Sequence, residues 1–584
     1  GEITRAYYNE EGKISEVHVP NGSKSIYTYD SNGQRIGSQE PGRGSSYCTY
    51  DSTGNYATFT TPSLGKVIYE RDSTGELTGT INALGGHVQI TYDHNGLPVK
   101  AVAPNGATEE YLRNDDGKVV RRKNLDGSLS HATYSSDGNL IAQQHPNGSV
   151  EEWAYDQNSN EKQYSINGQL FYSIDYQRKS KRTLATTTEN LTPVGQWVEQ
   201  FTMDPNLHHA VIEREANGLR VAWNLDQFNR PLDAIGPDGL RLSQRYNQCG
   251  DLSHMLDSTG YCVTYTKDNQ GRVQSHTSPT VTYQVGWENG LPVSLEAQQN
   301  VGYGSLQTHT SFIYDKESAL ITDVMRNDEV YSFSYDAGRQ LTGLYHANAQ
   351  GQHSQTRWEY NTTGQLVREV TAEGIEKIYS YTPDSRLLSI SASDGSLIEN
   401  TYDAMGQRTR TVFTGGERDG EVHHFGWDMR GYLWSLDIQR PGQETESHKF
   451  WYNVRNELAW VDGVFLTWDT STLSRESIVA INRHTITAQE HENIRVGASV
   501  DYTNIWRAPS VPLADLPAGF EVTESFGLAL GDYEIGYKEY IDSYQRTMLK
   551  PRPSQSDYVG HVAEFNRYAI NLNVPVSYYS IYQF

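Results

Sequence analysis

The chain has 584 residues, a formal net charge of −24 and only 36% hydrophobic residues. The acidic excess argues against nucleic-acid binding, which needs a positive surface for phosphate contacts, and no apolar stretch is long enough to span a membrane. Its 40 Tyr outnumber its 14 Phe, which suits a wide, thin sheet, because Tyr covers a sheet while its hydroxyl stays in water.

A Tyr-Asp motif followed by a glycine recurs from the first residues onward. In TYDSNGQRIGSQ, residues 28–39, Tyr29 is expected to end a strand. Asp30 and Gly33 are expected to form a tight turn, because Asp favours turns and glycine adopts positive φ at little cost. A step of 21 residues separates the turn glycines Gly12, Gly33, Gly54, Gly75, Gly96, Gly117 and Gly138. A fixed period of this kind predicts a repeat architecture.

Each repeat carries a second turn signal between two Tyr-Asp motifs. Examples are PNG at 20–22, 104–106 and 146–148, LDG at 125–127 and PDG at 237–239. Two turns in about 20 residues leave two strands of roughly 5–7 residues, which is a usual strand length. Segments such as VYSFSYD are rich in aromatic and alternating residues, as pleated strands are. The predicted unit is therefore a β-hairpin, repeated from Tyr8 to about Trp468 with an irregular part at 160–225.

The motifs YDSNGQRI, YDHNGLPV, YDAMGQRT and YDAGRQLTGL resemble YD repeats, also called Rhs repeats. This family includes bacterial Rhs effectors, wall-associated polymorphic toxins, the B and C components of insecticidal toxin complexes, and animal teneurins. The resemblance extends over most of the chain. It implies an all-β fold, a spiralling sheet of β-hairpins that forms a curved or closed shell, in many members around a toxic C-terminal segment.

One family feature is missing from this chain. Family members that release a cargo carry an aspartyl autoprotease motif of DPxG type after the last repeat. Here the only Asp-Pro pair is Asp204-Pro205, inside the irregular part. Self-cleavage at the usual place is therefore not expected. The chain also starts inside a repeat, so we expect it to be a processed or trimmed piece.

The sequence predicts two parts, a repeat shell at 1–470 and a C-terminal cap or plug at 471–584. The second part lacks the period, and a cap would cover the exposed edge of the sheet, which otherwise invites aggregation. Within it, Asp532 as N-cap and a stripe of aromatic residues at helical spacing predict a short helix near 532–549. That stripe comprises Tyr533, Tyr537, Tyr540, Ile541, Tyr544 and Met548.

A basic run in the irregular part is the candidate binding site. The run QRKSKR places four cations close together in a strongly acidic chain, and a histidine pair follows it. These residues are Arg178, Lys179, Lys181, Arg182, His208 and His209. The functional interpretation is an anion-binding patch, for example for a uronate polymer, and the alternative is a solvated hairpin tip.

No catalytic residues, metal site or cofactor are predicted. The stretch HTITAQEH is framed by His484 and His491 and followed by Asp501, Arg507 and His561, but it matches no catalytic spacing, so surface or packing histidines are expected. His423 and His424 follow a loop sequence and are expected to be exposed. Nucleophile-elbow, zinc-protease and phosphate-loop motifs are missing. The three cysteines Cys48, Cys249 and Cys262 form no disulfide framework, and free buried thiols are expected.

Two classes of function remain open at this point. The first is a non-catalytic shell or scaffold of a bacterial secreted or cell-surface protein of toxin type, which encloses a polypeptide cargo or binds a partner or a cell-surface glycan. The second is a polysaccharide lyase or hydrolase that uses a groove of the curved sheet. A bound oligosaccharide, or product formed from anionic polysaccharides, would separate them. Enzymatic activity and oligomeric state stay open.

Overall fold

The structure is a computed structural model that describes most of residues 4–490 and short parts of 510–551. The described ranges are 4–19, 24–468 and 478–490, with gaps at 43, 63, 180–181, 193–194, 205–210, 217, 229, 249, 269–271, 302–303, 429 and 454–456. The later parts are 510–511, 516–523, 528–530, 533–535 and 550–551. Within these ranges, no helix combines the length and the apolar character needed to cross a membrane.

Strands make up nearly all of the regular structure. The first sixteen are β1 Arg5–Tyr8, β2 Ile14–His18, β3 Lys24–Tyr29, β4 Arg35–Glu40, β5 Gly44–Tyr50, β6 Tyr56–Thr61, β7 Gly65–Arg71, β8 Leu77–Ile81, β9 His87–Tyr92, β10 Pro98–Val102, β11 Thr108–Arg113, β12 Val119–Lys123, β13 Leu129–Tyr134, β14 Leu140–Gln144, β15 Val150–Tyr155 and β16 Glu161–Ile166. The next are β17 Gln169–Lys179, β18 Arg182–Thr192, β19 Gly195–Asp204, β20 Val211–Ala216, β21 Leu219–Leu225, β22 Pro231–Ile235, β23 Arg241–Tyr246, β24 Leu252–Asp257, β25 Cys262–Lys267, β26 Val273–Thr277, β27 Val281–Glu288, β28 Leu291–Val301, β29 Gly304–Tyr314 and β30 Ile321–Arg326.

The remaining elements include one short helix. They are β31 Glu329–Tyr335, β32 Leu341–Ala347, β33 His353–Tyr360, β34 Leu366–Val370, β35 Glu376–Tyr381, β36 Leu387–Ala392, β37 Leu397–Tyr402, β38 Arg408–Thr414, the 3-10 helix η1 Gly416–Arg418, β39 Val422–Trp427, β40 Leu433–Gln439, β41 Glu446–Tyr452, β42 Leu458–Val461, β43 Val464–Trp468, β44 Ile478–Ile481 and β45 His484–Thr485. The last five strands are β46 Ser510–Val511, β47 Phe520–Thr523, β48 Leu528–Leu530, β49 Tyr533–Ile535 and β50 Lys550–Pro551.

Strands β1–β45 form one antiparallel sheet of 45 strands, in which each strand pairs with the next one along the chain. This confirms the prediction of an all-β fold of repeated hairpins. The large sheet continues past residue 470, because β44 pairs with β43 and β45 pairs with β44. The division of the chain into domains at 470 stays a prediction.

Strands β46–β50 form a second, five-stranded antiparallel sheet, again with each strand paired to the next. The predicted helix near 532–549 is wrong at its start, because Tyr533–Ile535 is strand β49 and pairs with Leu528–Leu530. The backbone groups of these three residues pair with the neighbouring strand β48. This pairing between strands overrides the helical spacing of the tyrosines. Residues 536–549 lie outside the described ranges.

The Tyr-Asp turns join each odd-numbered strand to the next even-numbered one across most of the sheet. In the turn at 30–34, the Asp30 carboxylate accepts hydrogen bonds from the backbone N–H of Asn32 (2.9 Å) and Gln34 (2.8 Å). The φ of Gly33 is +77°, which confirms the predicted left-handed position. Ser385 holds the corresponding position with φ +70°. The turn geometry therefore persists where glycine is replaced.

The Tyr of the motif links neighbouring hairpins. The Tyr29 hydroxyl donates to the carbonyl of Ile14, 15 residues earlier, at 2.8 Å, and Tyr402 donates to Leu387 in the same way at 2.6 Å. The strand register shifts at each of these tyrosines, for example between Thr28 and Tyr29. A β-bulge bends its strand and increases the local twist. Because the bulge recurs at the same edge, the sheet curves continuously.

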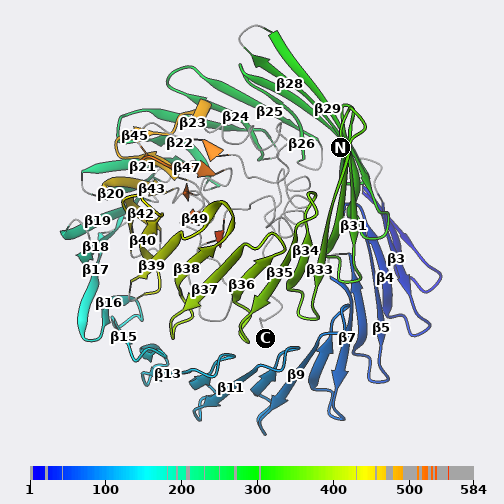
Figure 1. The fold of residues 1–584 in the computed structure, drawn as a ribbon, viewed down its shortest axis with the longest axis horizontal. Helices are drawn as coiled ribbons and strands as arrows, with labels where there is room; N and C mark the ends of the chain where they lie inside the picture. The colour runs from blue at the N-terminus through cyan, green and yellow to red at the C-terminus, as the bar shows by residue number, and fades with distance from the viewer. Residues whose placement is uncertain are drawn as a thin grey trace.

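The curved sheet closes on itself as a spiral of more than one turn. In Figure 1 the chain runs from β3 (blue) around the ring through β15 and β20 to β29, and β33–β40 (yellow-green) then lie inside the ring. Residues far apart in sequence meet where the two passes touch. The Asn82 side chain donates to the carbonyl of Thr362, 280 residues later, and the Ala488 N–H donates to Asp257, 231 residues earlier. The sequence separation between contacting residues falls from 280 to 231 along the spiral. The second pass therefore covers the same part of the ring with fewer residues than the first pass does.

Several contacts between the passes join the same two edges. Intervening turns, such as 82–86 and 103–107, connect even-numbered strands to odd-numbered ones in the first pass, and they meet second-pass turns that follow a strand-ending Tyr, Tyr360 or Tyr381. The Asn105 side chain donates to the carbonyl of Pro383 at 2.8 Å. A Cβ built on Gly86 would lie 2.1 Å from the carbonyl oxygen of Thr362. Small residues at this seam therefore let the two backbones approach closely.

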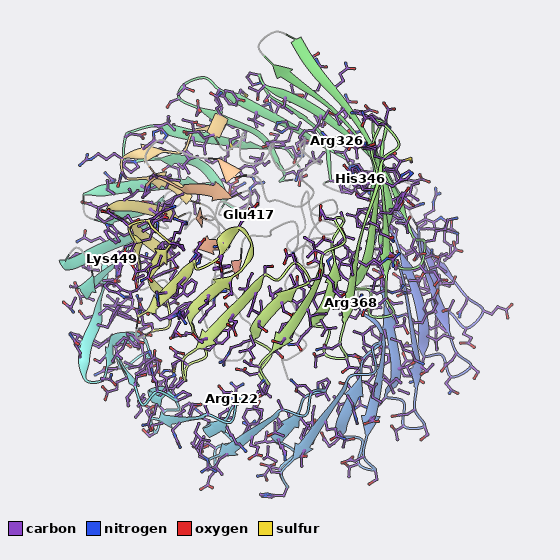
Figure 2. The ribbon with its side chains drawn as sticks, viewed as in Figure 1. Arg122, Arg326, His346, Arg368, Glu417 and Lys449 are labelled. Carbon is purple, nitrogen blue, oxygen red and sulfur yellow. The ribbon has the colours of Figure 1, made fainter. Side chains whose placement is uncertain are left out.

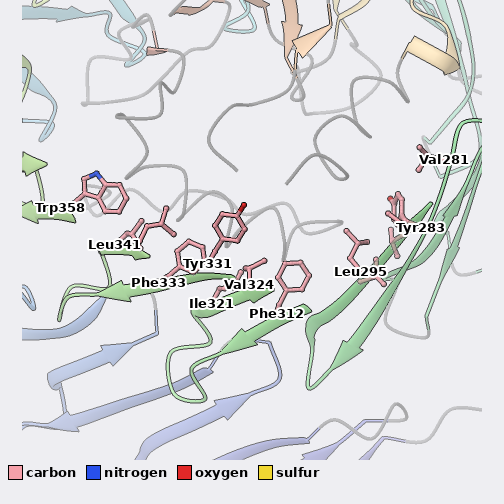
Figure 3. Packing of buried hydrophobic residues seen from close by; sticks show 14 residues of the cluster. Val281, Tyr283, Leu295, Phe312, Ile321, Val324, Tyr331, Phe333, Leu341 and Trp358 are labelled. Atoms are coloured by element: carbon pink, nitrogen blue, oxygen red, sulfur yellow. The ribbon is translucent and has the colours of Figure 1, made fainter. Parts of the chain in front are cut away.

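The apolar core lies on one face of the later strands. Figure 3 shows the labelled side chains on the side of β27–β33 that faces the centre of the spiral. The cluster comprises Val273, Val281, Tyr283, Val285, Leu295, Ala297, Phe312, Ile321, Val324, Tyr331, Phe333, Leu341, Leu344 and Trp358, all buried. In the described part of residues 4–163, Cys48 is the only buried hydrophobic side chain. The strands of this first part therefore form the thin sheet that the composition predicted, and buried apolar clusters begin at Tyr164 and continue through both passes.

The irregular part contains the longest hairpins. Strands β17 and β18 have 11 residues each, against five or six in most of the strands before them. Strands β28 and β29 are equally long. The predicted irregularity at 160–225 thus corresponds to extended hairpins within the same continuous sheet.

We predict that Gly96→Val lowers the stability of the protein more than Asn95→Ala does. The φ of Gly96 is +76° and nothing lies within 4 Å of an added Cβ, so the cost, about 1–3 kcal/mol, comes from the backbone strain of a β-branched residue. Asn95→Ala keeps the backbone N–H that donates to Asp93. Thermal unfolding of the two variants checks this, and equal midpoints would contradict the assigned role of the turn.

We also predict that Gly86→Ala weakens the contact between the two passes, because its Cβ would collide with the Thr362 carbonyl. Gly304→Ala in β29 is the matched control, since neither glycine has positive φ and nothing lies within 4 Å of a Cβ at Gly304. The midpoint of thermal unfolding should fall for Gly86→Ala alone. Identical midpoints would mean that the seam contributes little to stability.

Candidate functional site

The basic run lies at the tip of the β17–β18 hairpin. Arg178 and Lys179 end β17 and Arg182 begins β18, with Lys179 opposite Arg182 in the register. Lys181 lies outside the described residues, as do His208 and His209 in the connection between β19 and β20. Arg178, Lys179 and Arg182 are therefore neighbours on one hairpin, as their spacing in the sequence predicted. Anion binding by this run stays a prediction.

Of the histidines predicted near the C-terminal part, the structure describes His484. His484 is in β45, and its Nε2 lies 3.2 Å from the Glu490 carboxylate. His491, Asp501, Arg507 and His561 lie outside the described residues. Of the cysteines, Cys48 is buried and Cys262 is half-buried, both with free thiols, and Cys249 lies outside the described residues.

The expectation that His423 is exposed is wrong. His423 is 2% exposed, because it is the second residue of β39 and not part of the preceding loop, and His424 is half-buried. On a strand, side chains two residues apart share a face, so Glu421 and His423 point the same way. The pattern Glu-x-His recurs at Glu446 and His448. The pattern predicts that the two side chains lie on one face, but not that they are buried, because Glu16 and His18 form the same pair with side chains that are 36% and 39% exposed.

The first pair belongs to a charged cluster at the start of β39. The Glu421 carboxylate lies 2.6 Å from Nε2 of His423 and accepts a hydrogen bond from the Arg418 guanidinium at 2.8 Å. The same guanidinium lies over the Phe413 ring, 3.7 Å from its centroid. Burial raises the pKa of Glu421, but the hydrogen bonds from Arg418 and His423 outweigh it and lower the pKa to about 2.

The second pair surrounds His448 on β41. Its Nδ1 lies 2.7 Å from Asp462 and its Nε2 lies 2.9 Å from Glu446, and the side chain is 9% exposed. Burial lowers the pKa of His448, but the hydrogen bonds to Asp462 and Glu446 outweigh burial and raise it. His448 therefore stands between two carboxylates in a mostly buried position.

Arg440 joins the two clusters into one row. Its Nη1 donates to Glu446 at 2.6 Å, and its Nε lies 3.8 Å from Glu421. Positive and negative groups thus alternate from Arg418 across β39, β40 and β41 to Asp462. We call this row the charged ladder: Arg418, Glu421, His423, Arg440, Glu446, His448 and Asp462. Figure 2 places Glu417, next to the ladder, toward the centre of the spiral.

The second sheet contacts the wall of the spiral beside the charged ladder. Phe520, at the start of β47, is 2% exposed. Its ring packs edge-on against His448, with centroids 5.2 Å apart, and against Phe450 at 6.2 Å. Phe520 thereby joins a buried apolar cluster of β39–β44, and Leu516 packs against the same cluster. Figure 1 shows β47 and β49 inside the ring.

The charged groups of this region lie beside a buried apolar cluster. The carboxylates and bases of the ladder are engaged with one another, and no group of three or more metal-ligating side chains occurs in the part of the chain that the structure describes. Charge pairing permits these groups to be buried, and the apolar cluster beside them accepts an aromatic anchor. Paired charges and an aromatic contact therefore lie side by side on the inner wall.

We predict that Glu421→Gln lowers the free energy of unfolding at neutral pH and that this difference shrinks under acid conditions. The pKa of Glu421 in the folded protein, about 2, is below its ordinary 4.5, so its contribution is present above pH 4.5 and disappears as the pH falls toward 2. Exposed Glu417→Gln on the same connection is the control. Denaturant unfolding at several pH values checks this; a difference that does not depend on pH would contradict it.

Comparisons with known proteins place the chain only loosely. No protein-family model matches it, and no curated protein matches its sequence. Among solved structures, TcdB2-TccC3-Cdc42 is 12% identical with a TM-score of 0.43, covering 82% of this chain and 29% of that chain. TcdB2-TccC3 without its hypervariable C-terminal region is 11% identical with a TM-score of 0.41, covering 82% and 39%.

The Tc holotoxin pore of Photorhabdus luminescens with a mutated TccC3 is also similar. It is 11% identical with a TM-score of 0.42, covering 80% of this chain and 28% of that chain. The chain thus spans less than two fifths of the length of these three structures. The pairing of the strands by itself defines the fold.

Proposed function

We propose that the protein is a scaffold shell of toxin type that encloses polypeptide, and that the sheet β46–β50 of its own chain is retained inside the spiral. The observation that carries this proposal is the burial of Phe520 against His448 and Phe450 on the inner wall. An aromatic side chain in such a site anchors the segment that carries it, because the contact removes its apolar surface from water.

The distribution of apolar residues supports an enclosing role. A single-layer sheet that is curved by repeated bulges has a concave face, and the later strands place their buried hydrophobic side chains on that face (Figure 3). A surface of this kind is suited to holding a polypeptide segment. The resemblance of the Tyr-Asp motifs to Rhs repeats supports a secreted bacterial protein, and the missing autoprotease motif supports retention of the C-terminal part.

We predict that Phe520→Ala makes 516–535 much more sensitive to proteases while the spiral stays intact. Loss of the anchor leaves a gap in the buried cluster and should free the second sheet from the wall. Phe228→Ala is the matched control, since Phe228 is 67% exposed. Limited proteolysis with mass spectrometry of the fragments checks the order of cleavage.

The intact protein gives an independent readout. On prolonged storage the wild-type mass should stay at 65.8 kDa. Spontaneous cleavage between 465 and 500 would contradict retention of the C-terminal part. Equal protease sensitivity of the Phe520 and Phe228 variants would contradict the role of Phe520 as the anchor.

A further inference from the structure

Both ring nitrogens of His448 face a carboxylate. Nδ1 lies 2.7 Å from Asp462 and Nε2 lies 2.9 Å from Glu446. A neutral imidazole has one N–H and can donate to only one of them, whereas the imidazolium donates to both. The geometry around His448 is therefore that of the protonated form, with each carboxylate accepting one hydrogen bond.

The other charged groups around His448 leave this geometry in place. On its own strand, Glu446 also accepts from Arg440 at 2.6 Å, and Arg440 in turn lies 3.8 Å from Glu421. After β42, Asp462 also accepts from the backbone N–H of Lys449 at 2.7 Å. In β40, the residue opposite His448 is apolar Leu436. From the second sheet, the contact to His448 comes from the uncharged ring of Phe520.

Loss of the proton would change the surface on which Phe520 rests. A neutral His448 would donate to only one of its two carboxylates, and its other ring nitrogen would face the second carboxylate lone pair to lone pair, a repulsive contact that costs free energy. Rotation of the ring, or entry of water, would relieve that cost. Either change alters the edge-on contact between His448 and Phe520, whose ring centroids lie 5.2 Å apart.

We propose that His448 is a pH-sensitive contact that holds the sheet β46–β50 on the inner wall when protonated and releases it as the pH rises. The inference rests on the proposed function of the spiral as an enclosure. The direction follows from linkage: burial lowers the pKa of His448, but the hydrogen bonds to Asp462 and Glu446, which hold the ring in the orientation that Phe520 contacts, outweigh burial and raise the pKa above its ordinary 6.5. The contact is therefore fully stabilised below pH 6.5 and is lost as the pH rises through the raised pKa.

Exposure of the Phe520 side chain is the direct measurement. Hydroxyl-radical footprinting of the full chain at a series of pH values gives its oxidation rate. Phe312 (6% exposed) and Phe228 (67% exposed) serve as internal buried and exposed references. We expect Phe520 to react like Phe312 below pH 6.5. Above that pH its rate should rise by up to about tenfold per pH unit, because one proton is released, and then level off.

Asp462→Asn separates the proposed contact from a general effect of pH. Asp462 has φ +46°, a conformation that Asn adopts readily, and an Asn side chain can donate to Nδ1 of a neutral His448. We expect this variant to keep Phe520 buried across the whole pH series. Glu70→Gln, which alters the exposed pair of Glu70 and His87 at 2.7 Å, is the control and should behave as the wild type does.

The outcomes distinguish the two proposals. If Phe520 reacts as fast as Phe228 at every pH, the enclosure of the second sheet is wrong. If Phe520 stays as protected as Phe312 at every pH, the enclosure stands and the pH-sensitive contact is wrong. If Asp462→Asn shows the same rise in oxidation rate as the wild type, the proton of His448 does not control the contact.

Discussion

A hydrogen bond from the Tyr that ends a strand to a carbonyl of the preceding hairpin, 15 residues earlier at several turns, recurs along the sheet and holds the architecture together. Tyr155 donates to Leu140 at 2.8 Å and Tyr381 donates to Leu366 at 2.7 Å, and Trp427 substitutes its indole N–H for the hydroxyl. Each bond ties one hairpin to its predecessor at the position of a bulge, so every repeat adds curvature in the same sense. A sheet of 45 strands that bends in this way must meet itself, and the second pass then contacts the first.

The two passes of the spiral differ in the buried groups that they contribute to the interior. The described strands before residue 164 form a thin layer with little buried apolar surface, whereas the later strands have a buried apolar face, and the second pass adds the charged ladder of β39–β42. Charge pairing lets Glu421 and His448 be buried there, and Phe520 of the second sheet adds its ring to the same wall. His448 is both the titratable group and the residue that Phe520 contacts. The proposed enclosure and its proposed pH dependence therefore involve the same contact.

Most of the fold could be predicted because its signals are local. The Asp and Gly of each turn act within five residues, as the hydrogen bonds of Asp30 show, so their period in the sequence becomes the period of the sheet. The candidate site was harder to predict from the sequence. His423 follows a loop sequence, and its burial depends on the strand that begins one residue earlier. The helix expected near 532–549 was inferred from spacing alone, and pairing between strands overrides spacing at Tyr533–Ile535.

The sequence by itself determined the repeat unit, the turn positions, the all-β class and the thin, tyrosine-rich character of the sheet, because each follows from the preferences of adjacent residues. Only the tertiary structure decided which turns meet between passes, which face of the sheet is buried, and which charged groups pair. Those contacts join residues as far apart as Asn82 and Thr362. These contacts form only because many hairpins each add a small bend to the sheet. The total bend cannot be read from any short stretch of sequence.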